Sequence, residues 1–340
     1  MGTEFSNKQL IYRGEFQQRP AGRWSGNFGF FGMARDYRAT GAEALSPPVS
    51  QNTFALFALE QARLERLRFQ FGARLEHNGY DPQGLRGRSF TGLSAGAGVN
   101  VPLWKGGAFV ANFTHSYRAP ALEELYNRGP HIGNLTFEIG NPALRRETGD
   151  GIDISIRHES SRLRADFNVF HYRLGSFIYF APTGRIEDGL PEALASQANS
   201  RFLGVEGRAQ IGIHKLLWLN LGFDAVDAEL TRSSTPLPRI PPLRGRVGLD
   251  LRAGSLSLRP ELALTHRQDQ TAPNETATAG YAAMNLTANY TFTRQHFLHV
   301  FGMNFFNVAD RLCRNHLSLI KQLAPEIGRG VRFSYTLHFF

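Results

Sequence analysis

Alternation of apolar and polar residues with a period of two is the feature that most restricts the fold of this chain. In the segment from Arg162 to Phe170, the apolar side chains Leu163, Ala165 and Phe167 alternate with arginine, aspartate and asparagine. Successive side chains on a strand point to opposite faces, and a helix does not separate residues in this way. One face of the strand therefore meets an apolar environment and the other meets water. The same pattern recurs in the segments 67–76, 93–103, 219–225, 256–264, 284–292 and 331–339.

The connections between these segments alternate in length along the chain. The short ones lie near 17–24, 62–66, 103–106, 159–162, 213–216, 253–255 and 293–296. The long ones lie near 35–49, 78–89, 118–146, 175–200, 231–243, 269–280 and 307–328. Outer-membrane β-barrels have short periplasmic turns and long extracellular loops. This topology predicts that the chain ends at the periplasmic side and that its first strand runs towards the periplasm.

Strand length and strand number lead to a more specific prediction. Strands of roughly 10 to 14 residues are long for a soluble sheet but match a tilted membrane crossing, which needs about 9 to 11 residues. The pattern predicts about fifteen strands, whereas a complete bacterial barrel has an even number. The expected fold is therefore an all-β, transmembrane antiparallel β-barrel that residues 1–340 form as one domain, with N-terminal strands missing.

Composition excludes a helical membrane protein. The chain is 42% hydrophobic, and no apolar run approaches the roughly 20 residues that a spanning helix requires. The 35 glycines and 27 phenylalanines are typical of tight turns and of aromatic girdles at the two membrane interfaces. Residues 1–10 lack the basic and apolar regions of a signal peptide, which indicates a truncated or mispredicted start. Cys313 is the single cysteine, so an internal disulfide and a cysteine metal cluster are excluded.

The net charge of +9 does not indicate nucleic-acid binding. The 38 lysines and arginines are spread along the strands, and no basic run with interleaved aromatic residues occurs. We expect these arginines to line the lumen and to contact lipopolysaccharide, or an acidic plug, at the rims.

A motif between Ser116 and Tyr126 departs from the alternation. It is Ser-Tyr-Arg-Ala-Pro-Ala-Leu-Glu-Glu-Leu-Tyr, and it resembles the S-x-R-A-P-x-x-x-E-L-Y signature of TonB-dependent outer-membrane receptors. Further similar motifs follow in the order that this family has, and the resemblance covers nearly the whole chain. The residues that carry it include Arg118, Pro120, Glu123, Leu125 and Tyr126, then Gly140, Asn141 and Pro142, then Arg239, Pro241 and Pro242, then Gly328 and Arg329, and finally Phe340.

The resemblance implies a 22-stranded barrel around an N-terminal plug that carries a TonB box, and this chain shows neither plug nor TonB box. It is similar to the branch that contains zinc-uptake receptors, through residues 54–60, the Leu-Pro-Arg-Ile-Pro-Pro segment and residues 315–329. The implied function is uptake of a scarce metal ion or metal chelate with energy from the TonB system. The implied partners are outer-membrane lipid, the TonB system through the missing plug, and the barrel assembly machinery through the strand that ends at Phe340.

Candidate ligands follow from the predicted topology. The resemblance implies that histidine and acidic side chains near the extracellular mouth carry the metal, and imidazole with carboxylate is a reasonable ligand set for zinc. The residues expected there are His131, Glu138, His158, His266, Glu275 and His316. His131 and His316 are the leading metal candidates, because each lies in a long loop beside acidic or amide groups. We expect zinc or an iron chelate to be the transported substrate, and we expect no bound cofactor.

The motif around Arg118 also has an architectural interpretation. Pro120 stops strand pairing, and the Glu123-Glu124 pair can cap a short helical turn or pair with Arg118. A strand-turn-helix nucleophile elbow is absent, and nothing in the sequence brings Ser94 or Ser116 to a histidine and an aspartate, so we expect no enzyme. The alternatives to a TonB-dependent receptor are a passive porin, a non-functional receptor fragment and an outer-membrane enzyme.

Overall fold

The computed structural model describes residues 2–41 and 44–339, which form one 18-stranded sheet and one short helix. The helix is α1 (Leu122–Tyr126). The strands are β1 (Glu4–Gln17), β2 (Trp24–Thr40), β3 (Val49–Leu64), β4 (Leu67–Pro82), β5 (Arg88–Trp104), β6 (Gly107–Arg118), β7 (Arg128–His131), β8 (Thr136–Ile139), β9 (Glu147–Glu159), β10 (Leu163–Glu187), β11 (Leu190–His214), β12 (Leu217–Leu230), β13 (Thr235–Pro236), β14 (Arg244–Ala253), β15 (Leu256–Thr265), β16 (Tyr281–Arg294), β17 (Phe297–Phe306) and β18 (Gly330–Phe339).

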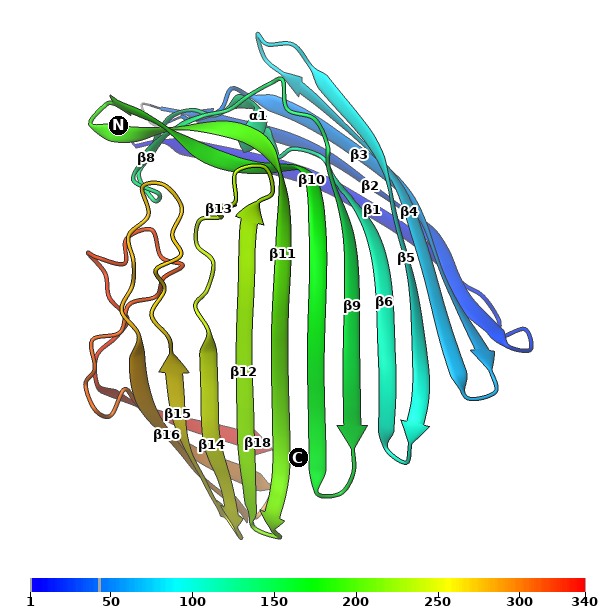
Figure 1. Cartoon of the computed structure of the whole chain (residues 1–340), viewed down its shortest axis with the longest axis vertical. Coiled ribbons are helices and arrows are strands. Elements are labelled where there is room, and N and C mark those ends of the chain that lie inside the picture. The colour runs from blue at the N-terminus through cyan, green and yellow to red at the C-terminus, as the bar shows by residue number, and fades with distance from the viewer. Residues whose placement is uncertain (1, 42–43, 340) are drawn as a thin grey trace.

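The long strands form a curved antiparallel wall in which each strand pairs with the next long strand of the chain (Figure 1). Within the described part of the chain, β1 pairs only with β2, and β18 pairs only with β17. The sheet is therefore all-β and barrel-like in curvature, but these residues do not close it.

The alternation of turns and loops is confirmed. In Figure 1 the short connections follow the lower and right-hand rim of the wall, and the long ones follow its upper and left-hand rim. In two of the short turns, Gly106 and Gly254 have positive φ angles of 80° and 58°, which glycine adopts without steric cost. Because the strands run alternately up and down, β1 runs from the loop end to the turn end, as the sequence predicted.

Two features of the strands differ from the prediction. The sequence predicted about fifteen strands, and the additional ones are β7, β8 and β13, of two to four residues each, which lie within the long loops. Residues 175–200 were expected to be a loop but continue β10 and β11, each of 25 residues, into a long hairpin. Irregularities between Leu174 and Phe177, and between Pro182 and Ile186, interrupt its register, so the period of two is lost there although the pairing continues.

The two faces of the wall differ in chemistry, as the alternation predicted. On β10, the side chains of Phe167 and Val169 are exposed on the apolar face. On the opposite face, Asp166 pairs with Arg157 of β9 at 3.1 Å. Exposed apolar side chains that line a whole face are stable only against a nonaqueous medium. Among the described residues, no helix is long and apolar enough to span a membrane.

A buried apolar cluster lies at the loop end of the wall and includes α1. Leu122 and Leu125 of α1 are almost fully buried and pack with Val49, Tyr80 and Leu144. The cluster thus joins α1 and the strands β3, β4 and β5 to the hairpin of β10 and β11, through Phe90, Ile178 and Ala195. Its position at the mouth fixes the long loops relative to the wall.

Candidate functional site

The arginine of the Arg-Ala-Pro motif holds two carboxylates. Arg118, at the end of β6, donates hydrogen bonds from Nη1 to Glu124 at 2.9 Å and from Nη2 to Glu147 at 3.1 Å. Glu124 also accepts a hydrogen bond at 2.8 Å from the backbone N–H of Ala121, which caps α1. Both of the architectural roles expected for the glutamate pair, cap and ion pair, therefore belong to Glu124 rather than to Glu123.

The other motif residues pack around the same helix. Pro120 is buried, and its carbonyl accepts a hydrogen bond at 2.8 Å from the Tyr80 hydroxyl. Asn141 donates its backbone N–H to the carbonyl of Glu124 at 2.8 Å. A Cβ on Gly140 would lie 2.6 Å from the backbone nitrogen of Tyr126, so only glycine fits without movement. Leu125 lies in the core of the cluster, and the carbonyl of Pro142 accepts a hydrogen bond from Arg88.

Two of the predicted ligands, His131 and Glu138, meet in the hairpin of β7 and β8. The Nδ1 atom of His131 lies 2.7 Å from Oε1 of Glu138, and Asn134 donates to the same oxygen at 2.7 Å. Glu138 is buried, whereas 41% of the His131 side chain is exposed. The Nε2 atom of His131 makes no hydrogen bond within the described residues. A carboxylate on one imidazole nitrogen orients the other as a metal ligand.

The other leading histidine, His316, is paired with Glu275 inside the packed loops. Its Nε2 atom lies 3.1 Å from Oε1 of Glu275, although the contact lacks good hydrogen-bond geometry. Its Nδ1 atom lies 2.8 Å from the Thr278 hydroxyl and 3.3 Å from Nζ of Lys321. Glu275 also accepts a hydrogen bond at 2.9 Å from the backbone N–H of Arg239. These contacts join three long loops into one buried network.

The protonation of this network favours neutral imidazole. Burial lowers the pKa of His316 below its ordinary value; the Glu275 carboxylate acts in the opposite direction, and the Lys321 ammonium adds to the lowering. Burial also lowers the pKa of Lys321, again against the effect of Glu275. A proton added to His316 would place a second positive charge beside the ammonium.

The remaining predicted residues are not brought to either pair. His266 follows β15, and its Nδ1 atom contacts the backbone carbonyl of Arg267 at 2.8 Å. The placement of His158 near the extracellular mouth is wrong, since it lies beside the short turn after β9 and accepts a hydrogen bond at 2.9 Å from the Trp104 indole. No group of three or more His, Cys, Asp or Glu side chains in the described ranges could hold a metal ion.

The later motif residues also have structural contacts. Arg239 has a positive φ of 59°, and Pro241 and Pro242 lie beside His266 along one groove. The backbone N–H of Arg329 donates to Asp310 at 2.8 Å, and Gly328 packs beside the same carboxylate. Phe340, expected at the periplasmic end, lies outside the described residues.

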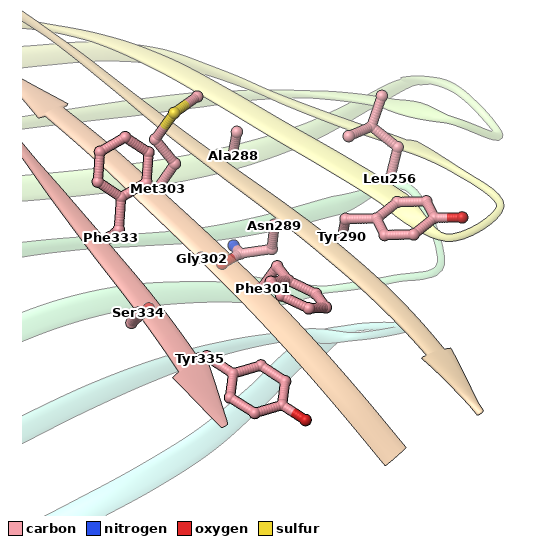
Figure 2. Close-up of a pocket in the computed structure, with 10 residues that line it drawn as sticks. All are labelled: Leu256, Ala288, Asn289, Tyr290, Phe301, Gly302, Met303, Phe333, Ser334 and Tyr335. Atoms are coloured by element: carbon pink, nitrogen blue, oxygen red, sulfur yellow. The ribbon is translucent and has the colours of Figure 1, made fainter. Parts of the chain in front are cut away.

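A groove of about 530 Å³ lies on the apolar face across β15 to β18 (Figure 2). The rings of Phe301 and Tyr335 pack at a tilt with their centroids 4.8 Å apart, and the Tyr335 hydroxyl lies 2.9 Å from Nδ1 of His299. Aromatic rings with polar tips are typical of the membrane interface. The groove therefore belongs to the lipid-facing surface and not to the mouth.

Comparisons with known proteins agree with this architecture. A family model described as TonB dependent receptor-like, beta-barrel, matches residues 2–308. The copper transporter OprC is similar with a TM-score of 0.85 and 18% identity, over 99% of this chain and 57% of that one. The FrpB iron transporter from Neisseria meningitidis has a TM-score of 0.75 and 14% identity, over 97% of this chain and 54% of that one. A mutant ferric enterobactin receptor, PfeA, from Pseudomonas aeruginosa has a TM-score of 0.76 and 16% identity, over 99% of this chain and 54% of that one.

A curved antiparallel wall with one apolar face, short turns at one end and long packed loops at the other defines a transmembrane β-barrel protein. The chain belongs to the TonB-dependent receptor-like β-barrel family. Relatives in this family are outer-membrane proteins of Gram-negative bacteria. The chain spans just over half the length of the solved structures it resembles.

Proposed function

We propose that this chain is the barrel part of an outer-membrane receptor that takes up a scarce metal ion or metal chelate with energy from the TonB system. The observation that carries the proposal is the family match, together with a common fold shared with one copper transporter, one iron transporter and one ferric enterobactin receptor. A plug, a TonB box and the remaining strands of a 22-stranded barrel are parts of the same proposal.

Zinc is the substrate that we propose, and His131 is its first contact at the mouth. In support, His131 is partly exposed, its Nδ1 atom is oriented by the buried Glu138 carboxylate, and its Nε2 atom faces no described partner. A single imidazole does not make a zinc site, because zinc takes four ligands in most proteins. Water or other side chains would complete the coordination during passage.

His316, the second metal candidate, has a structural role in this proposal. It is buried, and both of its ring nitrogens already face side chains. The Lys321 ammonium, 3.3 Å from Nδ1, would repel a cation bound there. We therefore assign His316 and Glu275 to the packing of the loops.

We propose neither a catalytic activity nor nucleic-acid binding for this chain. The two serines considered for a hydrolase both bond to backbone: the Ser94 hydroxyl accepts from the Tyr117 N–H at 3.0 Å, and the Ser116 hydroxyl donates to the Gly149 carbonyl at 3.3 Å. Lipopolysaccharide at the outer rim, and the barrel assembly machinery at the C-terminal strand, are the proposed partners in the membrane.

Uptake of radioactive zinc by cells that carry or lack the whole gene tests this function. We expect uptake under zinc starvation to fall on deletion of the gene and to fall equally when TonB is inactivated. A passive porin would keep its uptake without TonB. If only ferric chelate uptake responds to the deletion, the receptor assignment stands and zinc is the wrong substrate.

A further inference from the structure

A second built cluster lies on the polar face, at the short-turn end of the wall and far along the strands from the mouth. Asp250 of β14 is 6% exposed and accepts hydrogen bonds from Arg252, through Nε at 3.2 Å and Nη2 at 2.7 Å. It also accepts one at 3.1 Å from Nη2 of Arg259, on β15. One buried carboxylate therefore holds two guanidinium groups side by side. We name this cluster, with Arg164 and Trp218, the arginine notch.

The notch is hollow and lies close to the periplasmic turns. Two adjoining cavities of about 170 and 230 Å³ share Asp250 and Arg252, and the first also reaches Arg164 and Trp218. The backbone N–H of Arg252 bonds at 2.8 Å to the carbonyl of Leu216, in the short turn between β11 and β12. The same short-turn end was assigned to the periplasmic side.

The guanidinium groups keep most of their donors. Each arginine has five N–H donors, and within the described residues Arg252 uses two of its N–H-bearing nitrogens and Arg259 uses one, all towards Asp250. Both side chains are more than half exposed towards the lumen. Arg164 has only a distant contact, 3.7 Å, to the exposed Glu159. Three cations thus face the lumen around one aspartate that already accepts three hydrogen bonds, with Glu159 beside Arg164 and Glu261 at the edge of the second hollow.

We propose that the arginine notch is the docking site for an acidic segment of polypeptide that lies inside the lumen. Guanidinium groups bind carboxylates through paired N–H donors, and Asp250 preorganises two such groups. Trp218 provides a flat surface for the segment between Arg164 and Arg252. The two hollows, which extend from β10 to β15 across neighbouring strands, fit carboxylates spaced along one chain better than a single small anion. This inference rests on the proposed receptor function, in which a plug fills the barrel.

Binding of a dye-labelled hexaglutamate peptide to the purified full chain in detergent, followed by fluorescence anisotropy, tests the proposal. We expect saturable binding that weakens about tenfold or more in the variant R252A/R259A, because charge-assisted hydrogen bonds are lost. Arg246→Ala is the matched control, since Arg246 lies on the same face of β14 and makes no ion pair with any described residue; its affinity should not change. Hexalysine should not bind.

A second variant keeps the test valid if R252A/R259A fails to fold. Arg164→Ala removes an exposed side chain and should weaken hexaglutamate binding about threefold without loss of circular dichroism. Equal losses of hexaglutamate affinity in R246A and R164A would show that binding depends on net charge alone, and this result would overturn the proposal. Citrate or inorganic phosphate that displaces the peptide at equal concentration would make the notch a free-anion site. Absence of peptide binding would remove the docking site but leave the zinc-uptake result unaffected.

Discussion

At the residue scale, Gly140 is the position where the loop architecture depends most on a missing side chain. A Cβ there would lie 2.6 to 2.8 Å from backbone atoms of Leu125, Tyr126 and Asn127. We expect Gly140→Ala to lower the free energy of unfolding by about 2 kcal/mol, since the backbone cannot move away cheaply. Urea denaturation in detergent measures this. Gly79→Ala, where the nearest atom is 4.0 Å away, is the control, and equal losses in both variants would contradict the packing argument.

His131 carries the second prediction at this scale. His131→Ala should weaken zinc binding to the purified chain, and Glu138→Gln should weaken it by about tenfold, because the carboxylate orients the imidazole. Isothermal titration with zinc measures both. His266→Ala is the control, since among the described residues the His266 ring bonds to a neighbouring carbonyl and to no carboxylate. Unchanged zinc affinity in His131→Ala would exclude this residue as a ligand.

The sequence placed the candidate residues of the mouth in long loops but did not predict their partners. Glu138, His131, Glu275 and His316 were all placed in long external loops on topology alone. Their pairing depends on the turn between β7 and β8 in one case, and on two loops separated by the β16–β17 hairpin in the other. Lys321, which makes His316 a poor cation ligand, had no signal of its own. Arg252 and Arg259 looked like ordinary wet-face residues, because the burial of Asp250 depends on neighbouring strands.

At the element scale, the stability of the loop between β17 and β18 depends on the protonation of its buried histidine, His316. Burial lowers the pKa of His316 in the folded loop, whereas the unfolded loop keeps the ordinary value of about 6.5. The unfolded loop therefore binds the proton more tightly, and loop stability is lost as pH falls from the ordinary value through the lowered one. Between about pH 7.5 and about pH 5 we expect the protection of Cys313, a buried thiol in this loop, to fall about tenfold.

The rate at which a thiol reagent labels Cys313 measures how often this loop opens. At each pH this rate is divided by the labelling rate of the urea-denatured chain, because the ratio cancels the intrinsic reactivity of the thiol. Burial raises the pKa of the Cys313 thiol, and the Glu326 carboxylate adds to this effect. The comparison is needed because the fraction of reactive thiolate changes with pH. His316→Gln removes the titrating group and should make the protection independent of pH in this range. A pH dependence that survives in His316→Gln would assign the opening to another group.

The strands and turns were predictable from the period-two alternation of apolar and polar residues. The part of the β10–β11 hairpin that was missed lacks this alternation. Period two specifies a strand wherever one face is apolar. Above the membrane both faces of the β10–β11 hairpin meet water or other loops, so Gly175, Pro182 and Gly184 resembled a loop. Backbone pairing with register irregularities continues through this region nonetheless.

At the scale of the whole molecule, two kinds of site lie at opposite ends of the wall. The histidine–carboxylate pairs lie among the long loops, and the arginine notch lies at the short turns. Charged ladders such as Arg157–Asp166 and Arg201–Glu229 line the polar face between them. In the proposed receptor, a substrate that passes from mouth to periplasm would meet imidazole and carboxylate first and guanidinium last. The proposed cation selection at the mouth and the proposed docking of an acidic segment at the base are therefore compatible in one lumen.

The two edges of the wall lead to the last prediction. In an antiparallel edge strand, alternate N–H and C=O groups point away from the single partner, and β1 and β18 each have one partner within the described residues. In lipid such groups cost several kcal/mol each, so the edges either pair with further strands or draw in water. In the purified chain alone, alternate amides of β1 and β18 should exchange with deuterium far faster than those of β11, which is paired on both sides. Hydrogen exchange with mass spectrometry measures this, and β10 is the control. Equally slow exchange at β1, β18 and β11 would show that the edges are paired, by each other or by a second copy.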